Sequence, residues 1–329
     1  MPDIKCDIII PVWNEREFTE RCIESIANNT DVSHRVILVD NASDAETAVY
    51  LKELSEKNKG AVILIRNEEN IGFPKAVNQG IAISNAPYRC ILNNDTEVYK
   101  GWLEEMIKIA ESNSLIGIVN PSSNNLGQPQ PMEGFSGKWI EMSSCIGFCM
   151  LIKKEVIGKI GKLDEIYSPG NFEDTDFSRR AAKAGYKCVM AKGAYVYHGQ
   201  NTGFKKRKDW DEGFKRNLDI FNKRWGKIER IVYIIGKEDR YGAIKESVDS
   251  FLKAGHFVQI IFKCDIPSGI KEHASLRIFK VKSSITILWR VLMRKKRFNK
   301  IFTDSKFLTN IFHMFRYKTI SPLKREGSA

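Results

Sequence analysis

The feature that most constrains this 329-residue sequence is an alternation of apolar runs and helical patterns over its first hundred residues. Four runs are short and continuously apolar, as in strands buried on both faces of a sheet: residues 7–12, 35–39, 61–66 and 89–92. The segments between them place apolar residues at helical spacing: 18–27, 46–57 and 70–84. This alternation predicts an α/β fold, with a mainly parallel, Rossmann-like central sheet covered by helices on both faces.

Polar residues follow two of these runs. Asp40 comes directly after the second run, and Asn93-Asn94-Asp95 comes directly after the fourth. Because the carboxyl ends of parallel strands meet at one edge of a sheet, we expect Asp40 and Asp95 to face a common crevice. A purely structural interpretation stays open for both motifs, since Asp40 also suits a helix cap and Asn93–Thr96 also suits an Asx turn.

The middle of the chain holds further candidates. Residues 121–137 are rich in turn-forming residues, and they form either a lid or an ordinary long loop. Glu173, Asp174 and Asp176 lie where a helix is expected to begin, and acids at that position also suit the helix dipole. His198 ends a strand-like run, where a histidine is more often structural than a metal ligand.

The pattern changes after a basic, tryptophan-containing stretch at 205–227. From residue 229 an apolar run, a helical segment and a second apolar run predict a βαβ-like unit, and no GxGxxG fingerprint marks a dinucleotide site. We therefore place a domain boundary after residue 228. Residues 229–329 are expected to be a smaller basic region, α/β or helical. They resemble the opening half of a second Rossmann-like domain, in which case the chain is a piece of a longer protein.

The positive charge is concentrated in one tail. The chain has a net charge of +12, and residues 271–329 alone carry 15 Lys plus Arg against 3 acids. Residues 285–289 are apolar and residues 294–297 are basic, a combination typical of a helix at a membrane surface. An anionic membrane is thus one expected partner of residues 271–329, and an auxiliary α/β piece with a solvated surface is the alternative. Nucleic acid is not expected, because no recognised binding module accompanies the charge.

Other signals concern the cellular location. No apolar run is long enough to span a bilayer, and the N-terminus lacks the pattern of a secretory signal. The seven cysteines are scattered without a zinc-binding spacing, so they are expected to be buried thiols. The expected location is cytoplasmic, with peripheral attachment at the inner face of the cell membrane as a further expectation.

Seven motifs occur in a characteristic order between residues 3 and 204: PVWNE, VDNAS, NIGFPKAVNQG, LNNDTEV, GFCMLIKKEV, GNFEDTDFSRRA and YVYHG. In this set the chain resembles the family 2 glycosyltransferases, which have the A-type, Rossmann-like fold and invert the anomeric carbon. Within that family it is most similar to the bacterial branch that builds surface polysaccharides or glycoconjugates. The resemblance implies that residues 1–228 form a glycosyltransferase catalytic domain.

The resemblance also implies which residues hold the substrate and metal. The residues implied to bind the nucleotide-sugar are Pro11, Val12, Asn14, Glu15, Asp40, Lys75, Asn93, Asn94, Asp95 and Gly147. Asp40 would accept a hydrogen bond from the base, and Lys75 would help to neutralise the diphosphate. Asp95 and His198 would bind Mn²⁺ or Mg²⁺. Asn93 replaces the first acid of the family's Asp-x-Asp motif and would contact ribose or metal-bound water.

For the reaction, the resemblance implies a single displacement with one carboxylate base. Asp174 would be that base, Glu173 would orient a substrate, and Gly147 would let the donor sugar approach closely. A UDP-sugar is the favoured donor and a dTDP-sugar the next. The acceptor is expected to be a hydroxyl of a glycan, lipid-linked or protein-linked molecule, contacted by residues 121–137 and 202–210. The alternative, motivated by Asn93, is a non-catalytic sugar-nucleotide-binding or scaffold subunit.

Overall fold

The computed structural model describes residues 4–199, 210–237 and 240–320. The chain forms two compact units, the first ending at Arg224 and the second beginning at Trp225. This division falls close to the boundary expected after residue 228. Helix α7 (Trp210–Trp225) ends at the division. None of the helices in the described ranges has the length and apolar character needed to cross a bilayer.

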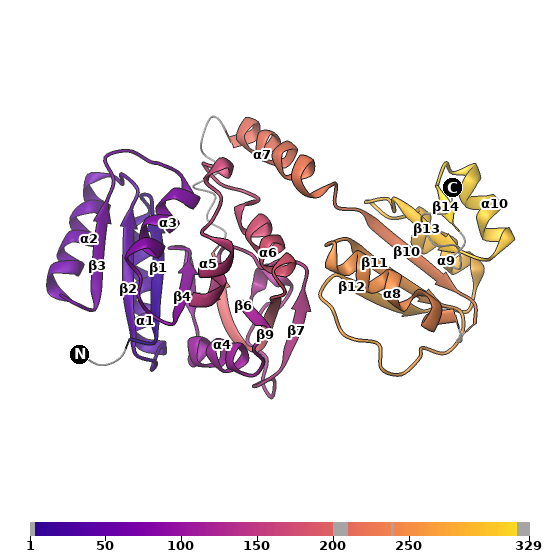
Figure 1. Ribbon diagram of the computed structural model, residues 1–329, viewed down its shortest axis with the longest axis horizontal. Coiled ribbons are helices and arrows are strands. Elements are labelled where there is room, and N and C mark those ends of the chain that lie inside the picture. The colour runs from indigo at the N-terminus through magenta and orange to yellow at the C-terminus, as the bar shows by residue number, and fades with distance from the viewer. Residues whose placement is uncertain (1–3, 200–209, 238–239, 321–329) are drawn as a thin grey trace. The chain divides into compact units, whose positions relative to one another are not determined.

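The first half of the unit 1 sheet is parallel, as the sequence predicts. Its strands are β1 (Cys6–Val12), β2 (His34–Asp40), β3 (Val62–Arg66) and β4 (Tyr88–Leu92), in the order β3-β2-β1-β4 (Figure 1). The connecting helices are α1 (Arg16–Asn29), α2 (Ala45–Lys57) and α3 (Phe73–Ile83). The carboxyl ends of the four strands therefore lie along one edge, with Asp40 and Asn93 at two of them.

The second half of this sheet is mixed and continues in the order β4-β8-β6-β9-β5, with β7 paired to β9. Its strands are β5 (Thr96–Val98), β6 (Ile116–Ser122), β7 (Trp139–Met142), β8 (Cys149–Lys153) and β9 (Lys187–His198). The sequence patterns do not predict β5, β6 or β7, and they find only the last five residues of β9. These strands escape detection because they are short or contain polar residues such as Asn120.

Helices cover both faces of the unit 1 sheet. Alternate side chains of β1 separate the two cores, since Ile8 packs with α1 residues such as Ile26 while Ile9 packs with Val77 of α3. Helix α4 (Trp102–Glu111) joins α1 and α2 on one face. Helices α5 (Lys154–Ile160) and α6 (Glu173–Lys183) join α3 on the other. Two short 3₁₀ turns, η1 (Asn124–Leu126) and η2 (Glu165–Tyr167), lie in the loops.

Unit 2 is a smaller parallel α/β unit, one of the two forms expected for this region. Its strands are β10 (Arg230–Ile235), β11 (Phe257–Phe262), β12 (Leu276–Lys280), β13 (Lys300–Thr303) and β14 (Thr319–Ile320), in the order β12-β11-β10-β13-β14. Helix α8 (Arg240–Lys253) covers one face. Helices α9 (Ser284–Leu292) and α10 (Lys306–Met314) cover the other (Figure 1).

The cysteines behave as the sequence predicts. All seven are free thiols, and six of them are buried, the exception being the partly exposed Cys264. Burial raises the pKa of the Cys22 thiol to about 12, which disfavours the reactive thiolate.

Candidate active site

The loops that follow β1 and β2 contain strained backbone conformations and are joined by hydrogen bonds. Asn14, Glu15 and Ala42 have positive φ angles of 57°, 60° and 61°, which residues other than glycine rarely adopt. The Asn14 backbone N–H donates to Ser43 Oγ at 2.9 Å, and its side-chain oxygen accepts from the Asp44 N–H at 2.8 Å. Such conformations cost on the order of 1–3 kcal/mol each and cluster at functional sites, so this edge of the sheet is a candidate site.

Asp40 lies buried at the end of β2 and is already held by two partners. Its Oδ1 accepts from the Ser43 N–H at 2.9 Å, and its Oδ2 forms an ion pair with Arg66 at the end of β3. Arg66 is half exposed, and the sequence patterns did not identify it as a site residue. The sequence signal that could have identified Arg66 is a charged residue at the carboxyl end of a predicted strand.

Pro11 and Val12 contribute mainly backbone to this edge. The Val12 side chain is fully buried in the core, while its carbonyl oxygen accepts from the Asn41 N–H at 2.7 Å. The Asn41 side-chain oxygen in turn accepts from the Ile71 N–H at 3.0 Å, which ties the loop before α3 to the same edge.

The residues after β4 meet His198 at the end of β9. The Asp95 Oδ1 lies 3.1 Å from His198 Nε2, and the Asn93 side-chain nitrogen lies 3.5 Å from the same ring atom. The Asn93 Oδ1 is buried and finds no hydrogen-bond donor among the described residues. Asn94 turns away from this cluster, because its side-chain nitrogen donates to Thr19 Oγ1 at 3.0 Å. The structure thus brings together Asn93, Asp95 and His198, which lie more than 100 positions apart.

The loop at 121–137 supports His198. The Asn124 side chain bonds both the backbone N–H and the backbone oxygen of His198, each at 2.9 Å. The Asn125 side-chain amide contacts His198 Nδ1. The Phe148 ring stacks on the imidazole with centroids 5.0 Å apart. Neither the two asparagines nor Phe148 was identified from the sequence, because Asn-Asn in a turn-rich loop resembles ordinary turn composition.

The rest of this loop is also anchored. The Tyr195 hydroxyl donates to the carbonyl oxygens of Gln128, at 3.3 Å, and Pro129, at 3.0 Å. The Lys192 N–H donates to the Lys138 oxygen at 2.8 Å. These bonds to β9 at both ends of the loop favour the ordinary long loop over the lid. The other expected acceptor segment, residues 202–210, lies outside the described residues except for Trp210.

Two acids begin α6 after a strained turn. Asn171 and Phe172 have φ angles of 77° and 73° and lead directly into Glu173 and Asp174. Glu173 is buried, and its Oε2 has no hydrogen-bond donor among the described residues. Burial and the neighbouring Asp174 carboxylate raise the pKa of Glu173 to about 8. Glu173 is therefore mostly protonated at neutral pH.

Asp174 differs from Glu173 in exposure and hydrogen bonding. It is half-buried, and its carboxylate accepts from the Gly147 N–H at 2.9 Å and the Thr175 N–H at 2.6 Å. Burial raises the pKa of Asp174 above its ordinary value, although these hydrogen bonds favour the charged form. The result is a solvent-accessible carboxylate of increased basicity.

The two clusters meet at one peptide segment. Gly147 donates its N–H to Asp174, while the next residue, Phe148, accepts from the Asn93 N–H at 2.8 Å and stacks on His198. The fully buried Asn120 holds the start of this segment, since its Oδ1 accepts from the Ile146 N–H at 2.7 Å. The Asp95–His198 pair and the Glu173–Asp174 pair therefore flank consecutive residues.

Helix α3 is fastened to the same region through its first turn. A side chain at Gly72 would place its Cβ 2.8 Å from Pro169 Cα, and the Phe73 N–H donates to the Pro169 oxygen at 2.9 Å. Lys75 is exposed in this first turn, and its side chain makes no ion pair within the described ranges. Glycine at position 72 thus permits the contact between α3 and the loop before Glu173.

Asp176 has the structural role expected of it. It is fully buried and accepts from Arg180 Nε at 2.7 Å and from an Arg224 nitrogen at 2.8 Å. Two guanidinium groups on one carboxylate leave little capacity for a substrate, so Asp176 fastens α7 to α6.

The donor set around Asp95 suits a hard divalent cation. A carboxylate oxygen, an imidazole nitrogen and an amide oxygen are ligands that Mn²⁺ and Mg²⁺ accept. The Asn93 Oδ1, which has no donor among the described residues, is also free to accept a hydrogen bond from a ligand or from metal-bound water. No group of three or more His, Cys, Asp or Glu that could hold a metal ion occurs in the part of the chain described.

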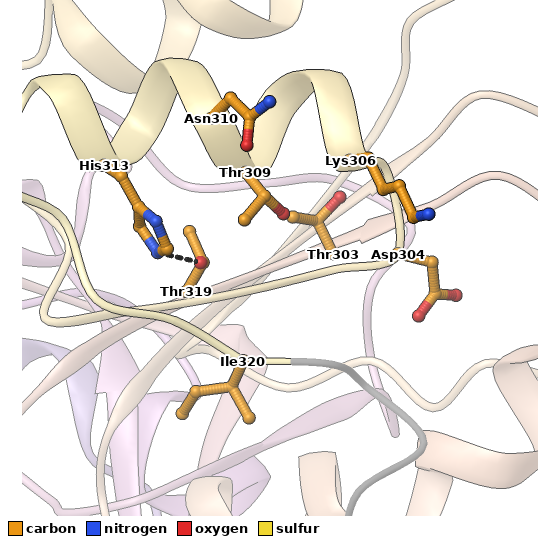
Figure 2. A pocket seen from close by; sticks show the side chains of 8 residues that line it. All are labelled: Thr303, Asp304, Lys306, Thr309, Asn310, His313, Thr319 and Ile320. Carbon is orange, nitrogen blue, oxygen red and sulfur yellow. Dashed lines mark hydrogen bonds between the residues drawn. The ribbon is translucent and has the colours of Figure 1, made fainter.

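Unit 2 contains a cavity of about 430 Å³ beside α10. Figure 2 shows the residues that line it: Thr303, Asp304, Lys306, Thr309, Asn310, His313, Thr319 and Ile320. The His313 Nε2 and the Thr319 hydroxyl form a hydrogen bond of 2.7 Å. None of these residues was selected from the sequence as a site residue, and the cavity is open and lined on one side by an edge strand.

The sequence model of glycosyl transferase family 2 matches residues 7–161, which include Asn93 and Asp95 but not Asp174 or His198. Residues 7–161 are thus similar to the family 2 glycosyltransferases, in agreement with the resemblance drawn from the motifs.

Among curated relatives, glycosyltransferase AglE of Haloferax volcanii is 25% identical over 197 residues, which cover 56% of this chain and 63% of AglE. The amylovoran biosynthesis glycosyltransferase AmsB of Erwinia amylovora is 27% identical over 208 residues, which cover 58% of this chain and 68% of AmsB. An uncharacterized protein, y4gI, of Sinorhizobium fredii is 24% identical over 247 residues, covering 66% of this chain and only 27% of y4gI. The chain thus spans less than two thirds of the length of AglE and of y4gI.

Solved structures confirm the A-type fold. GalNAc-T7, determined with UDP, GalNAc and Mn²⁺, superposes with a TM-score of 0.55 at 15% identity, covering 69% of this chain and 49% of that one. The mannosyltransferase PcManGT of Pyrobaculum calidifontis, determined with GDP-Man and Mn²⁺, gives a TM-score of 0.51 at 17% identity, covering 61% and 58%.

Proposed function

We propose that this protein is an inverting, divalent-metal-dependent glycosyltransferase that moves a sugar from a nucleotide-sugar to an acceptor hydroxyl. The observation that carries the proposal is the convergence of Asp95–His198 and Glu173–Asp174 on the consecutive residues Gly147 and Phe148. One cluster has the groups to hold a diphosphate through a cation, and the other has a carboxylate able to accept a proton. Similarity to family 2 supports the same reaction.

The nucleotide is proposed to lie along the ends of β1 and β2. Asp40 offers an acceptor beside the donor groups of Arg66, which complements the adjacent N–H and C=O of uracil or thymine. The rigid Asn14–Ser43 link would hold this edge in one geometry. A UDP-sugar is the proposed donor, with a dTDP-sugar next. TarS of S. aureus, which has a TM-score of 0.51 at 16% identity, was determined with UDP-GlcNAc.

The metal is proposed to be Mn²⁺ or Mg²⁺, bound by Asp95 Oδ1 and His198 Nε2. A bound divalent cation would offset the negative charge that develops on the leaving diphosphate. Coordination through Nε2 requires the other ring nitrogen to carry the proton, and the Asn125 amide lies against that nitrogen. With its oxygen turned toward Nδ1–H, Asn125 would accept a hydrogen bond from that group and leave the Nε2 lone pair for the cation. Lys75, in the first turn of α3, is proposed to approach the same diphosphate.

Asp174 is the proposed general base and Glu173 an orienting acid. Because the pKa of Glu173 lies at about 8, its protonated carboxyl can donate a hydrogen bond and is poorly able to accept a proton. Asp174 is reachable from solvent, and its raised pKa improves proton acceptance from an attacking hydroxyl. Gly147 presents its N–H to this carboxylate and would let the donor sugar come close.

The acceptor is proposed to be a glycan or lipid-linked molecule used in making surface polysaccharide or glycoconjugate, at the cytoplasmic side of the cell membrane. AmsB, 27% identical to this chain, is named for amylovoran biosynthesis. A non-catalytic sugar-nucleotide-binding subunit remains the second candidate, because Asn93 replaces an acid of the family motif.

The distinguishing experiment is a donor screen with purified protein. Release of nucleotide is measured from UDP-, dTDP- and GDP-sugars in Mn²⁺, in Mg²⁺ and in chelator. The glycosyltransferase predicts metal-dependent release from one donor class, strongest for a UDP-sugar. Tight binding of a nucleotide without turnover of any donor, and with no effect of metal, would favour the non-catalytic subunit.

A further inference from the structure

Helix α9 has one apolar face that the described residues leave exposed. Its Ile287 and Val291 are buried against the unit 2 sheet, as expected of an amphipathic helix. At the same time Ile285, Trp289 and Met293 are 77%, 66% and 71% exposed. Their spacing of four residues aligns them along one side of the helix. Single exposed apolar residues are common, whereas a continuous stripe that includes a tryptophan marks an interaction surface.

Helix α10 adds apolar residues beside the end of α9. It covers the same face of the sheet, and it exposes Met314, at 80%, and Phe315 at its C-terminal end. Arg297, which follows α9, donates to the Phe315 carbonyl oxygen at 2.6 Å. Its guanidinium also lies 4.3 Å from the centre of the Tyr317 ring. These contacts join the segment after α9 to the end of α10.

Cations surround these apolar residues. Residues 282–318 contain ten Lys plus Arg and one acid, Asp304, which pairs with Arg240. Several of these side chains are exposed and form no ion pair within the described ranges, among them Lys295, Lys296, Arg316 and Lys318. The charge that the sequence concentrates in this tail is thus available at a surface that also exposes apolar side chains.

Helix α8, on the opposite face of the sheet, provides the contrast. Its exposed residues include both signs of charge, among them Lys245, Glu246, Asp249 and Lys253. No large apolar side chain of its described residues is exposed. Apolar exposure and unbalanced positive charge therefore occur together on the α9–α10 face and are both missing from α8.

We propose that the outer side of α9, with the end of α10, is a docking surface for an anionic lipid membrane. Ile285, Trp289 and Met293 enter the headgroup boundary, where indole is favoured, and the surrounding lysines and arginines contact lipid phosphates. Charge selects this occupant over a second copy of the chain, because self-association through the same face would oppose cations with cations. The surface is independent of the proposed sugar transfer, since it uses residues of unit 2 only.

The test uses the full chain and flotation with vesicles of phosphatidylcholine alone or mixed with phosphatidylglycerol. Binding is expected only to the anionic vesicles and is expected to weaken as salt rises. The double variant Lys295→Gln/Lys296→Gln should bind about 30-fold more weakly, since each lysine near an anionic surface contributes a factor of about 5. The matched variant Lys245→Gln/Lys253→Gln, on α8, has the same net charge and should bind as the wild type does.

A second pair of variants tests the apolar contribution. Trp289→Ser/Met293→Ser should reduce binding at least about 10-fold, whereas Ile266→Ser, an exposed apolar residue outside both helices, should not. Nucleotide release from the donor should be unchanged in all four variants, which separates this surface from the proposed active site.

Several results would overturn the proposal: no binding to anionic vesicles at low salt, equal weakening by the α8 variant, or tighter binding to duplex DNA than to the vesicles. A dimer that Trp289→Ser/Met293→Ser dissociates, with no vesicle binding, would assign the surface to self-association instead.

Discussion

The two units begin with the same arrangement of strands and differ in what lies at the carboxyl edge. In unit 1 the parallel strands run β3-β2-β1-β4, and in unit 2 the corresponding order is β12-β11-β10-β13. The fourth strand of each is followed closely by an aspartate, Asp95 in unit 1 and Asp304 in unit 2. Asp95 faces His198, whereas Asp304 pairs with Arg240 at the start of α8. The same topology therefore surrounds two different chemical environments.

Strain and burial show the same difference. The described part of unit 1 has five non-glycine residues with positive φ, all in loops beside the candidate site: Asn14, Glu15, Ala42, Asn171 and Phe172. In the described part of unit 2 such a residue occurs only at Arg316, after α10. Unit 1 buries several carboxyl groups, Glu173 among them, and unit 2 buries none within its described ranges. The comparison shows that the fold provides the carboxyl edge of a parallel sheet, and that particular residues at this edge form a candidate active site.

The largest expected difference between the two edges concerns their aspartates. Asp95→Ala should lower metal-dependent nucleotide release by about 100- to 1,000-fold and abolish the effect of metal on nucleotide binding, because a direct ligand is lost. Asp304→Ala, at the corresponding place in unit 2, should change neither nucleotide release nor the effect of metal on nucleotide binding. Calorimetry of nucleotide binding with and without Mn²⁺ measures the effect of metal.

The position before Asp95 sharpens this test. Asn93→Asp should be tolerated, since it restores an acid to a site that is proposed to hold a cation. Equal losses in Asp95→Ala and Asp304→Ala would remove the distinction between the two edges.

A smaller effect is expected at Asn125, which lies against His198 Nδ1. Asn125→Ala should weaken Mn²⁺ binding about 10- to 100-fold, because the imidazole loses the partner that fixes its tautomer. Asn125→Asp should retain the affinity, since a carboxylate can only accept from Nδ1–H and leaves Nε2 for the cation. Titration of Mn²⁺ in the presence of UDP reads out both variants, and weakened binding in Asn125→Asp would exclude this role.

A different kind of effect is a pH dependence of stability that is expected of unit 1 only. Glu173 has an ordinary pKa of 4.5 and a folded-state pKa of about 8. Between these values the unfolded chain loses a proton that the folded protein keeps, so wild-type stability falls as pH rises from about 4.5 to 8. Glu173→Gln removes this loss and should gain on the order of a few kcal/mol over the wild type at pH 8, with little difference near pH 4.

Thermal unfolding at several pH values measures this gain, with the exposed Glu56→Gln as the control. A constant difference between wild type and Glu173→Gln across this range would mean that Glu173 is ionised in the folded protein.

Much of the fold was predictable because the parallel strands are continuously apolar and end in polar residues. The order of motifs also pointed to residues that the structure brings together, such as Asp95 with His198 and Gly147 with Asp174. The strands that were missed are those whose burial depends on neighbours distant in sequence. β5 is only three residues long, and its Thr96 and Val98 are buried because the chain pairs there with the end of β9.

The residues that support the site were harder to predict. Asn124, Asn125 and Phe148 act through contacts with His198 across 50 to 74 positions, and no local pattern specifies such pairs. Arg66 could have been noticed as a charge at a strand end, but only the register of β2 and β3, which pairs Asp40 with Arg66, places the two side by side. A local pattern thus identifies the edge of a sheet, whereas the pairing of side chains across it requires the tertiary structure.

The most direct measurement compares Asp174→Asn with Asp211→Asn, since both aspartates lie in the first turn of a helix. Nucleotide release from the best donor and calorimetric binding of the nucleotide are measured for both variants. If Asp174 is the base, its variant should lose about 100- to 10,000-fold in turnover while binding the nucleotide as tightly as the wild type, and Asp211→Asn should match the wild type in both. Full turnover in Asp174→Asn would contradict the proposed reaction site.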